Sequence, residues 1–335
     1  MLASEGHPFV LMLPFAVVAC FWILSAFDKK PTGPGFWKRN GIAVSIFLIV
    51  AVGLWALFMI VLPQLFMVEM SFRPKLPFTQ MGGARDIYTF ENYRYFLYGS
   101  TRDTSSWNSL HLTAFATTII VSVLVTLFNF AFCYPIAFYM AQVATAARVR
   151  LLLLLLIAPY WINEVLRAFA FRVMFAGSGV LNRFLQWTGA ISEPFDFLGN
   201  NVALYMGLSY AYLLLLVFPL YNAVESLDRR QIEAARDLGA PWWHIHLFIV
   251  MPHAKPGIAS GCTLVFMLTS GALAAPLVLG GPRTLWFTPI VYDRFYQAFN
   301  WPQGSAYAFI LLLTCVAFVL LVLKATKLSL GEMTK

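Results

Sequence analysis

Long apolar segments separated by short polar stretches constrain the fold of this 335-residue chain more than any other feature. A helix needs roughly 20 apolar residues to cross the hydrocarbon core of a bilayer. Runs of this kind lie at about residues 9–27, 42–68, 110–141, 151–175, 202–223, 257–280 and 305–324. Charged residues make up only 11% of the chain, against about 25% in a soluble domain. The sequence therefore predicts an all-α polytopic membrane protein.

Prolines fall inside six of these segments: Pro14, Pro63, Pro135, Pro159, Pro219 and Pro276. Neighbouring helices can satisfy the backbone groups that a proline frees, so we expect these prolines to be tolerated as kinks. The segment at 9–27 has no basic residues before its apolar run, which distinguishes it from a signal peptide. We expect it to be an additional transmembrane helix.

Basic residues in the connecting segments predict the orientation. Of the 23 lysines and arginines, thirteen lie in or beside the connections at 28–40, 142–150, 224–256 and 325–335, and eight lie on the longer opposite side. Lysine and arginine are enriched in cytoplasmic loops. We therefore expect the N-terminus outside and the C-terminus in the cytoplasm. The formal charge of +8 is then a topology signal, and we expect no nucleic-acid partner.

A polar island at residues 224–256 carries the most specific pattern in the chain. Glu233-Ala234-Ala235 is followed, after three residues, by Gly239 and, after nine more, by Ile249-x-Met251-Pro252. Residues 224–238 have the composition of a short helix, and Gly239 can adopt the left-handed conformation that ends one. We expect a helix, a sharp turn and a second helix. This shape can transmit a rigid-body push from a soluble partner into the membrane helices.

The pattern resembles the EAA loop by which permease subunits of bacterial ABC importers contact their ATPase. From about residue 42 to 325 the chain is similar to the spermidine/putrescine-type permeases of that class. The resemblance is carried by Asn108-Ser109-Leu110, PYWINEVLRAFAFRVMFAGSGVLNRFLQWTG, YNAVESLDRRQIEAARDLGA and NWPQGSAYAFILL. It implies a six-helix permease core at 42–325 with its coupling loop at 224–256. Residues 1–41 would be an extra helix with a linker, and residues 326–335 a cytoplasmic tail.

The resemblance also implies partners and a cargo. A second permease, two ATPases and an extracytoplasmic substrate-binding protein would complete the assembly in the lipid of the bacterial inner membrane. The chain has no GxxxxGK[ST] phosphate loop, so ATP and Mg are expected on the ATPase and no cofactor on this chain. We find no nucleophile–base pair and no metal cluster, and expect a transport subunit and not an enzyme. Polyamine is the expected substrate.

Particular residues of the loop acquire roles from the same resemblance. Glu233 would meet a basic residue or a backbone amide of the ATPase, and Ala234 and Ala235 would pack into its groove. Gly239 would make the turn. The further contact residues would be Arg229, Arg230, Arg236, Asp237 and, at the end of the loop, Pro252. His244 and His246 are expected at the interface or facing lipid headgroups.

Ionisable residues also occur in the predicted span at 151–175. Glu164 and Arg167 are three residues apart, so they share a helix face and could pair. Charges at membrane depth usually face a bundle interior or an aqueous cavity. Glu164 is thus either a negative site for a cationic substrate in the translocation pathway or half of a structural ion pair. Tyr160, Trp161 and Asn163 would neighbour a passing solute, or pack between helices.

Two alternatives remain at this point. The same machine could import an opine, another amino-acid derivative, ferric iron or an oxyanion. A stand-alone transporter driven by an ion gradient is the other class, but such proteins usually carry mid-membrane carboxylates. Glu164 is the one carboxylate found there.

Overall fold

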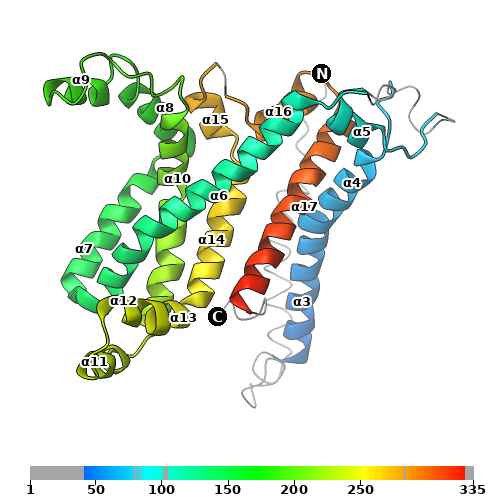
Figure 1. The fold of residues 1–335 in the computed structure, drawn as a ribbon. Coiled ribbons are helices and arrows are strands. Elements are labelled where there is room, and N and C mark those ends of the chain that lie inside the picture. The colour runs from blue at the N-terminus through cyan, green and yellow to red at the C-terminus, as the bar shows by residue number, and fades with distance from the viewer. Residues whose placement is uncertain are drawn as a thin grey trace, which may run out of the picture. The chain divides into compact units, whose positions relative to one another are not determined.

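The computed structural model describes residues 41–77, 80, 83, 85–100, 105–282 and 284–328. Within these ranges the chain forms helices and loops and no strand, which confirms the predicted all-α fold (Figure 1). Four helical segments of this part are long and apolar enough to cross a membrane, and each overlaps a predicted span: Ile42–Ser71, Ser109–Val143, Val202–Glu225 and Trp301–Thr326. The predicted helix at 9–27 and residues 329–335 of the predicted tail lie outside the described residues.

The chain divides into two compact units between Glu69 and Met70. The described part of the first unit is an apolar helix made of α3 (Ile42–Ala56), a π-helical turn η1 (Leu57–Val61) and most of α4 (Leu62–Ser71). Its large apolar side chains are mostly exposed. A helix that is apolar on all sides requires lipid or another apolar surface around it.

The second unit is built on three mutually packed helices, α6 (Ser109–Phe138), α10 (Val202–Glu225) and α14 (Lys255–Ser270). Small residues let α10 and α14 approach closely. A Cβ added to Gly257 would lie 2.3 Å from the carbonyl oxygen of Pro219, and one added to Gly261 would lie 2.5 Å from Leu216 Cδ1. Contacts of this kind are typical of helix pairs in membranes.

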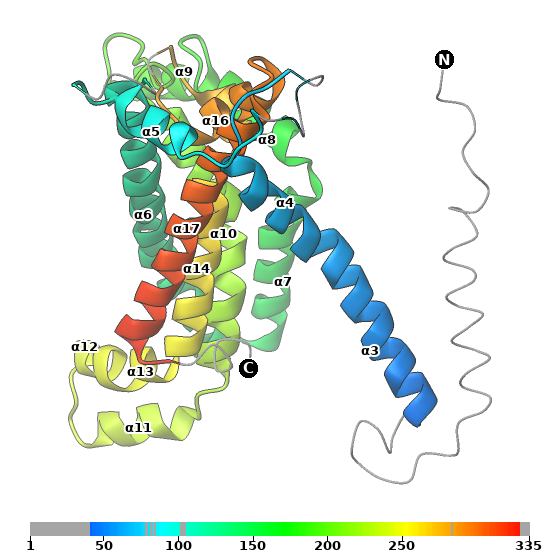
Figure 2. The ribbon, with the colours of Figure 1, turned by 90° about the vertical axis from the view of Figure 1, so that its right-hand side faces the viewer.

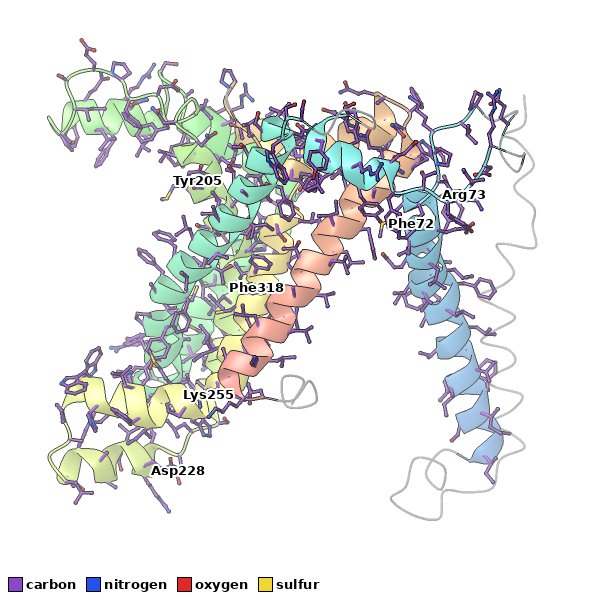
Figure 3. All side chains as sticks on the ribbon, turned by 45° about the vertical axis from the view of Figure 1, so that its right-hand side comes forward. Phe72, Arg73, Tyr205, Asp228, Lys255 and Phe318 are labelled. Carbon is purple, nitrogen blue, oxygen red and sulfur yellow. The ribbon has the colours of Figure 1, made fainter. Side chains whose placement is uncertain are left out.

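A fourth long helix, α17 (Trp301–Thr326), packs against α14. The rings of Phe266 and Phe318 stack with their centroids 3.7 Å apart, and Phe318 is labelled on α17 in Figure 3. Stacked rings of this kind add to the apolar contact between the two helices.

The predicted span at 151–175 is wrong as a single helix. α7 (Ala146–Ile157) runs into a 3₁₀ turn, η4 (Ala158–Trp161), and α8 (Glu164–Met174) leaves that turn at an angle of 95°. Pro159 contributes to the break because it has no N–H to donate and its ring excludes the preceding helical geometry. Counted together, the two arms make a fifth candidate span in the described chain.

The predicted span at 257–280 is also interrupted. α14 ends at Ser270, and the short helix α15 (Ala274–Leu279) begins after three residues. Pro276 lies in the first turn of α15, where its missing N–H is tolerated. The first backbone bond of α15 runs from the N–H of Leu277 to the carbonyl of Leu273 at 3.2 Å.

The short helices gather at the two ends of the second unit (Figures 1 and 2). One end holds α11 (Arg229–Asp237), α12 (Trp242–Ile245), η5 (His246–Val250) and α13 (Met251–His253). The other holds α5 (Glu91–Tyr98), α8, α9 (Val180–Trp187), α15 and α16 (Phe287–Tyr296). Tyr205 and Asp228 lie toward opposite ends of α10 (Figure 3). The polar loop thus lies at the end of the unit opposite α8 and α15.

Candidate coupling loop and substrate cavity

The polar loop contains the predicted helix, but the helix begins later than expected. α10 continues to Glu225, and α11 starts only at Arg229. Asp228 caps α11, because its side-chain oxygen accepts a hydrogen bond from the backbone N–H of Arg230 at 3.0 Å. The sequence carries this signal as an aspartate followed three residues later by Gln231, the pattern of a capped helix start.

Gly239 ends α11 in the manner predicted. Its φ of +78° is left-handed. The N–H of Gly239 donates to the carbonyl of Arg236 at 2.9 Å, and the N–H of Ala240 donates to the carbonyl of Ala235 at 3.0 Å. These two bonds form a Schellman motif, which favours glycine at the left-handed position. The chain then turns sharply into α12, with Pro241 as its N-terminal cap.

A small apolar core joins α11 to the helices that follow it. Ile232 of α11 is buried together with Ile245 and Val250, and Leu227 and Ala254 close the cluster. Because this core includes the end of α10 and the start of α14, the loop folds as one body with the membrane helices. Through this core α11 is packed onto both α10 and the start of α14.

Polar contacts attach the loop to η3 (Tyr139–Val143), the π-helical turn that continues α6. The Gln142 side chain donates to the carbonyls of Val224 and Leu227 at 2.8 and 3.1 Å. The Arg229 guanidinium donates to the carbonyl of Gln142. Arg229, expected as a contact to the ATPase, thus also braces α11 from within the chain.

His246 lies where the sequence did not place it. Its side chain is buried, its Nδ1 is 2.7 Å from the hydroxyl of Tyr134, and the rings of Phe138 and Trp242 lie 4.5 and 4.4 Å away. Burial lowers the pKa of His246, and the charge of Arg236 lowers it further. His246 therefore links η5 to α6, whereas His244 is exposed as expected for an interface residue.

The outward surface of α11 carries the remaining predicted residues. Glu233, Ala234, Arg236 and Asp237 are exposed, whereas Ala235 is half-buried against the loop core. Leu238, at the turn, has 88% of its surface exposed. Pro252, in α13, is exposed as well. The loop thus presents a firmly held helix with small, charged and apolar side chains to the surroundings.

A cavity of about 580 Å³ lies at the other end of the second unit, between the two broken spans. Its walls come from the start of α8, the break between α14 and α15, and single residues of α10 and α16. The lining is Glu164, Val165, Tyr212, Met267, Leu268, Gly271, Ala272, Leu273, Ala274, Leu277, Val278 and Tyr292. Glu164 is its one charged residue.

Glu164 and Arg167 share a face of α8 but form no ion pair with each other, although the structure describes both. The carboxylate of Glu164 accepts a hydrogen bond from the hydroxyl of Tyr212 at 3.3 Å. The Arg167 guanidinium lies over the ring of Tyr160 at 4.7 Å and near that of Tyr210 at 5.8 Å. Arg167 is therefore held by aromatic faces, an arrangement favourable for a guanidinium out of water.

The hydroxyl of Tyr160 also forms hydrogen bonds with the backbone of α10. It donates to the carbonyl of Tyr210 at 2.7 Å and accepts from the N–H of Leu214 at 3.0 Å. These two backbone groups are four residues apart and would otherwise bond to each other within α10. The hydroxyl is thus inserted into the hydrogen-bond ladder of α10 and ties it to the break between α7 and α8.

The other predicted pathway residues do not line the cavity. Trp161 is 85% exposed, and Asn163 caps α8 by accepting from the N–H of Val165 at 2.8 Å. Arg172, further along α8, donates to the carbonyl of Val278 at 2.6 Å. This bond holds α8 against the C-terminal end of α15. The positive charge of Arg172 is also stabilised there, because that end of the helix dipole is negative.

Comparison with known proteins identifies the family. The family of the binding-protein-dependent transport system inner membrane component matches residues 133–326. The spermidine/putrescine transport system permease protein PotB of Haemophilus influenzae is 32% identical over 278 residues, covering 82% of this chain and 91% of that protein. PotB of Escherichia coli K12 is 30% identical over 283 residues, covering 84% and 97%. The chain belongs to this permease family.

Two solved structures share the fold of this permease. A bacterial ABC transporter that imports the acidic polysaccharide alginate is 17% identical, with a TM-score of 0.63 over 84% of this chain and 93% of that one. The alginate transporter in complex with a pentasaccharide-bound periplasmic protein gives a TM-score of 0.65 at 17% identity, over 88% and 99%. At this identity the likeness concerns the fold alone.

The assignment confirms the resemblance drawn from the sequence. The chain is a multi-pass inner-membrane permease subunit of an ABC importer, and it is similar over most of its length to the spermidine/putrescine permeases PotB. Its relatives are transport subunits, consistent with a role in forming a pathway and not in catalysis.

Proposed function

We propose that this permease imports a polyamine and couples that import to ATP hydrolysis on a partner chain. The similarity to PotB proteins over most of both chains supports a polyamine as the substrate, because those relatives are named as permeases of spermidine/putrescine transport systems. The proposed coupling to the ATPase is supported by one observation, the close attachment of α11 to α6, α10 and α14. A helix held in this way can move the membrane helices only as one body.

The partner ATPase would contact the outward surface of α11. Glu233 would meet a basic group or backbone amide, and Ala234 would allow close approach of the partner. Arg236 and Asp237 would lie at the edge of the contact, with Pro252 at the end of the loop. Ala235 would act mainly by packing α11 onto the loop core, since it is half-buried there.

The complete machine would hold this permease, a second permease and two ATPases, each using ATP and Mg. An extracytoplasmic binding protein would deliver the substrate at the end that holds α8, α9 and α15. The N-terminus would lie outside and the C-terminus in the cytoplasm. Closure of the ATPases on ATP would bring the coupling loops together and open the cavity outward, and hydrolysis would reset it.

The charges of the cavity bear on the alternative cargoes. An oxyanion would meet the carboxylate of Glu164 with no arginine or lysine among the lining residues. Arg167, the nearest such group on α8, is engaged by tyrosine rings. Because like charges repel, the cavity favours a cation over an oxyanion.

The test is co-expression of the permease with its neighbouring transport genes, followed by purification in mild detergent and an ATPase assay. We expect an ATPase and a second permease to co-purify with the wild type. Gly239→Asp should shed the ATPase, whereas Gly189→Asp, at another left-handed glycine far from the loop, should retain it. A wild-type subunit that purifies alone and without ATPase activity would contradict the proposal.

A further inference from the structure

The cavity combines one carboxylate, two phenol rings and an otherwise apolar lining. Glu164 is its charged residue, Tyr212 and Tyr292 supply the rings, and aliphatic side chains such as Met267, Leu268 and Leu277 form much of the remaining wall. Pockets that bind small molecules are typically apolar with a few well-placed polar groups. The composition alone fits a ligand with an alkyl body and a positive end.

The carboxylate of Glu164 has no cationic partner in the part of the chain that the structure describes. Its one side-chain contact there is the Tyr212 hydroxyl at 3.3 Å. Tyr212 is buried, which fixes the direction from which it donates. Glu164 is exposed where it lines the cavity, so a cation from outside the chain can reach its carboxylate.

Arg167 is the group that would otherwise fill this role. It lies one helical turn from Glu164, at a spacing that normally permits pairing. Instead its guanidinium is held over Tyr160 at 4.7 Å, with Tyr210 at 5.8 Å. The two rings thus keep the internal cation away from Glu164.

A weaker cation acceptor also lines the cavity. The ring of Tyr292, on α16, offers a face to which an ammonium group is attracted. This ring would receive a second charge or orient the alkyl chain.

We propose that Glu164 binds an ammonium group of an alkyl amine in this cavity, and that Tyr160 and Tyr210 keep the site open by holding Arg167. Tyr212 positions the carboxylate, and the apolar wall takes the methylene chain. This inference rests on the proposed polyamine import and assigns it a binding residue and a positioning residue. If the contact of Arg167 with the two tyrosine rings is weakened, Arg167 should pair with Glu164 and prevent amine binding even though the carboxylate is intact.

The experiment uses the full transporter, reconstituted into proteoliposomes with its binding protein and ATP, and measures uptake of radiolabelled spermidine. Glu164→Gln should lower the initial uptake rate about tenfold or more, since hydrogen bonds to charged groups are worth that factor. Glu164→Asp should retain more uptake than Glu164→Gln. Glu193→Gln removes an exposed carboxylate that does not line the cavity and should transport like the wild type. Thermal midpoints of the purified complexes check that each variant folds.

The second arm tests Arg167. Tyr210→Leu should lower uptake, because it removes one of the two rings and lets Arg167 turn toward Glu164. Adding Arg167→Gln to Tyr210→Leu should restore most of the lost uptake, an outcome that simple damage to packing would not give.

The possible failures are distinguishable. Uptake by Glu164→Gln equal to wild type, or no recovery in the double variant, would overturn the amine site while leaving polyamine import intact. A wild-type transporter that takes up no spermidine or putrescine would overturn both the proposed substrate and the site built on it.

Discussion

Replacing Tyr160 with phenylalanine should separate the broken span from α10 while leaving the aromatic contact to Arg167 in place. The hydroxyl lies between the carbonyl of Tyr210 and the N–H of Leu214, at 2.7 and 3.0 Å. Without the hydroxyl, two outcomes are possible. Either both backbone groups are left without a partner, or the N–H of Leu214 bonds to the carbonyl of Tyr210 as in a regular α-helix.

The magnitudes decide between these outcomes. Leaving both groups unsatisfied would cost about 1–3 kcal/mol for each. Closing the ladder recovers one backbone bond and loses two interhelical ones, which average only about 0.6 kcal/mol each in membrane proteins. Residues 210–214 are already helical, so closure needs only a small local shift. We therefore expect a small loss of stability, about 0.5 kcal/mol, together with a local rearrangement of α10.

We expect Tyr160→Phe to impair transport more than it impairs the stability of the complex. α10 connects the cavity to the coupling loop, so Tyr160 ties the movement of that loop to the wall that bears Glu164. We expect Tyr160→Phe to lower spermidine uptake in proteoliposomes severalfold with little change in the thermal midpoint of the complex. Tyr210→Phe is the matched control, because the Tyr210 hydroxyl has no hydrogen-bond partner among the residues that the structure describes, and the substitution keeps its ring. Equal uptake by the two variants would refute the reasoning.

Three further outcomes follow from the geometry. Gly239→Ala should destabilise the coupling loop by about 1–2 kcal/mol, the cost of a side chain in the left-handed region, and Gly239→Asn by less; equal yields of ATPase-bound complex from the two would contradict this. Gly261→Ala should lower the thermal midpoint, since its Cβ would lie 2.5 Å from Leu216 Cδ1, whereas Gly53→Ala, with nothing within 4 Å, should not. Because burial lowers the pKa of His246, the unfolded chain binds more protons there than the native one as pH falls below about 6.5. Stability should decline with acidification in the wild type and decline less in His246→Gln, as thermal midpoints at pH 8 and pH 5.5 would reveal.

Much of the fold could be predicted because the bilayer imposes a length and composition on every span. The four uninterrupted candidate spans match their predicted positions within a few residues. The breaks at Pro159 and in the stretch before Pro276 could not be placed in this way. A proline inside an apolar run is compatible with a kink or with an end, and only packing against neighbouring helices decides.

The loop was predicted well where local backbone chemistry determines the structure. Gly239 ends α11 because the left-handed turn needs a residue without Cβ, a requirement visible in the sequence. The start of α11 was also visible, in Asp228 and Gln231, but the composition of residues 224–238 favoured an earlier start. The burial of His246 depends on contacts with α6, more than a hundred residues earlier, and has no local signal.

The side-chain partners of the cavity were the least predictable part. Spacing on α8 favoured an ion pair between Glu164 and Arg167, but rings from η4 and α10 hold the arginine instead. Tyr160 was singled out as a neighbour of a passing solute, whereas its hydroxyl occupies the backbone ladder of α10. Both outcomes depend on how separate helices meet in space.

The most direct test of the account is spermidine uptake by proteoliposomes that contain the co-purified complex and its binding protein, with and without ATP on the side of the coupling loop. Accumulation that requires both ATP and the binding protein, and that is lost in Gly239→Asp, is the predicted result. Accumulation driven by a proton or sodium gradient in the absence of ATP would contradict it.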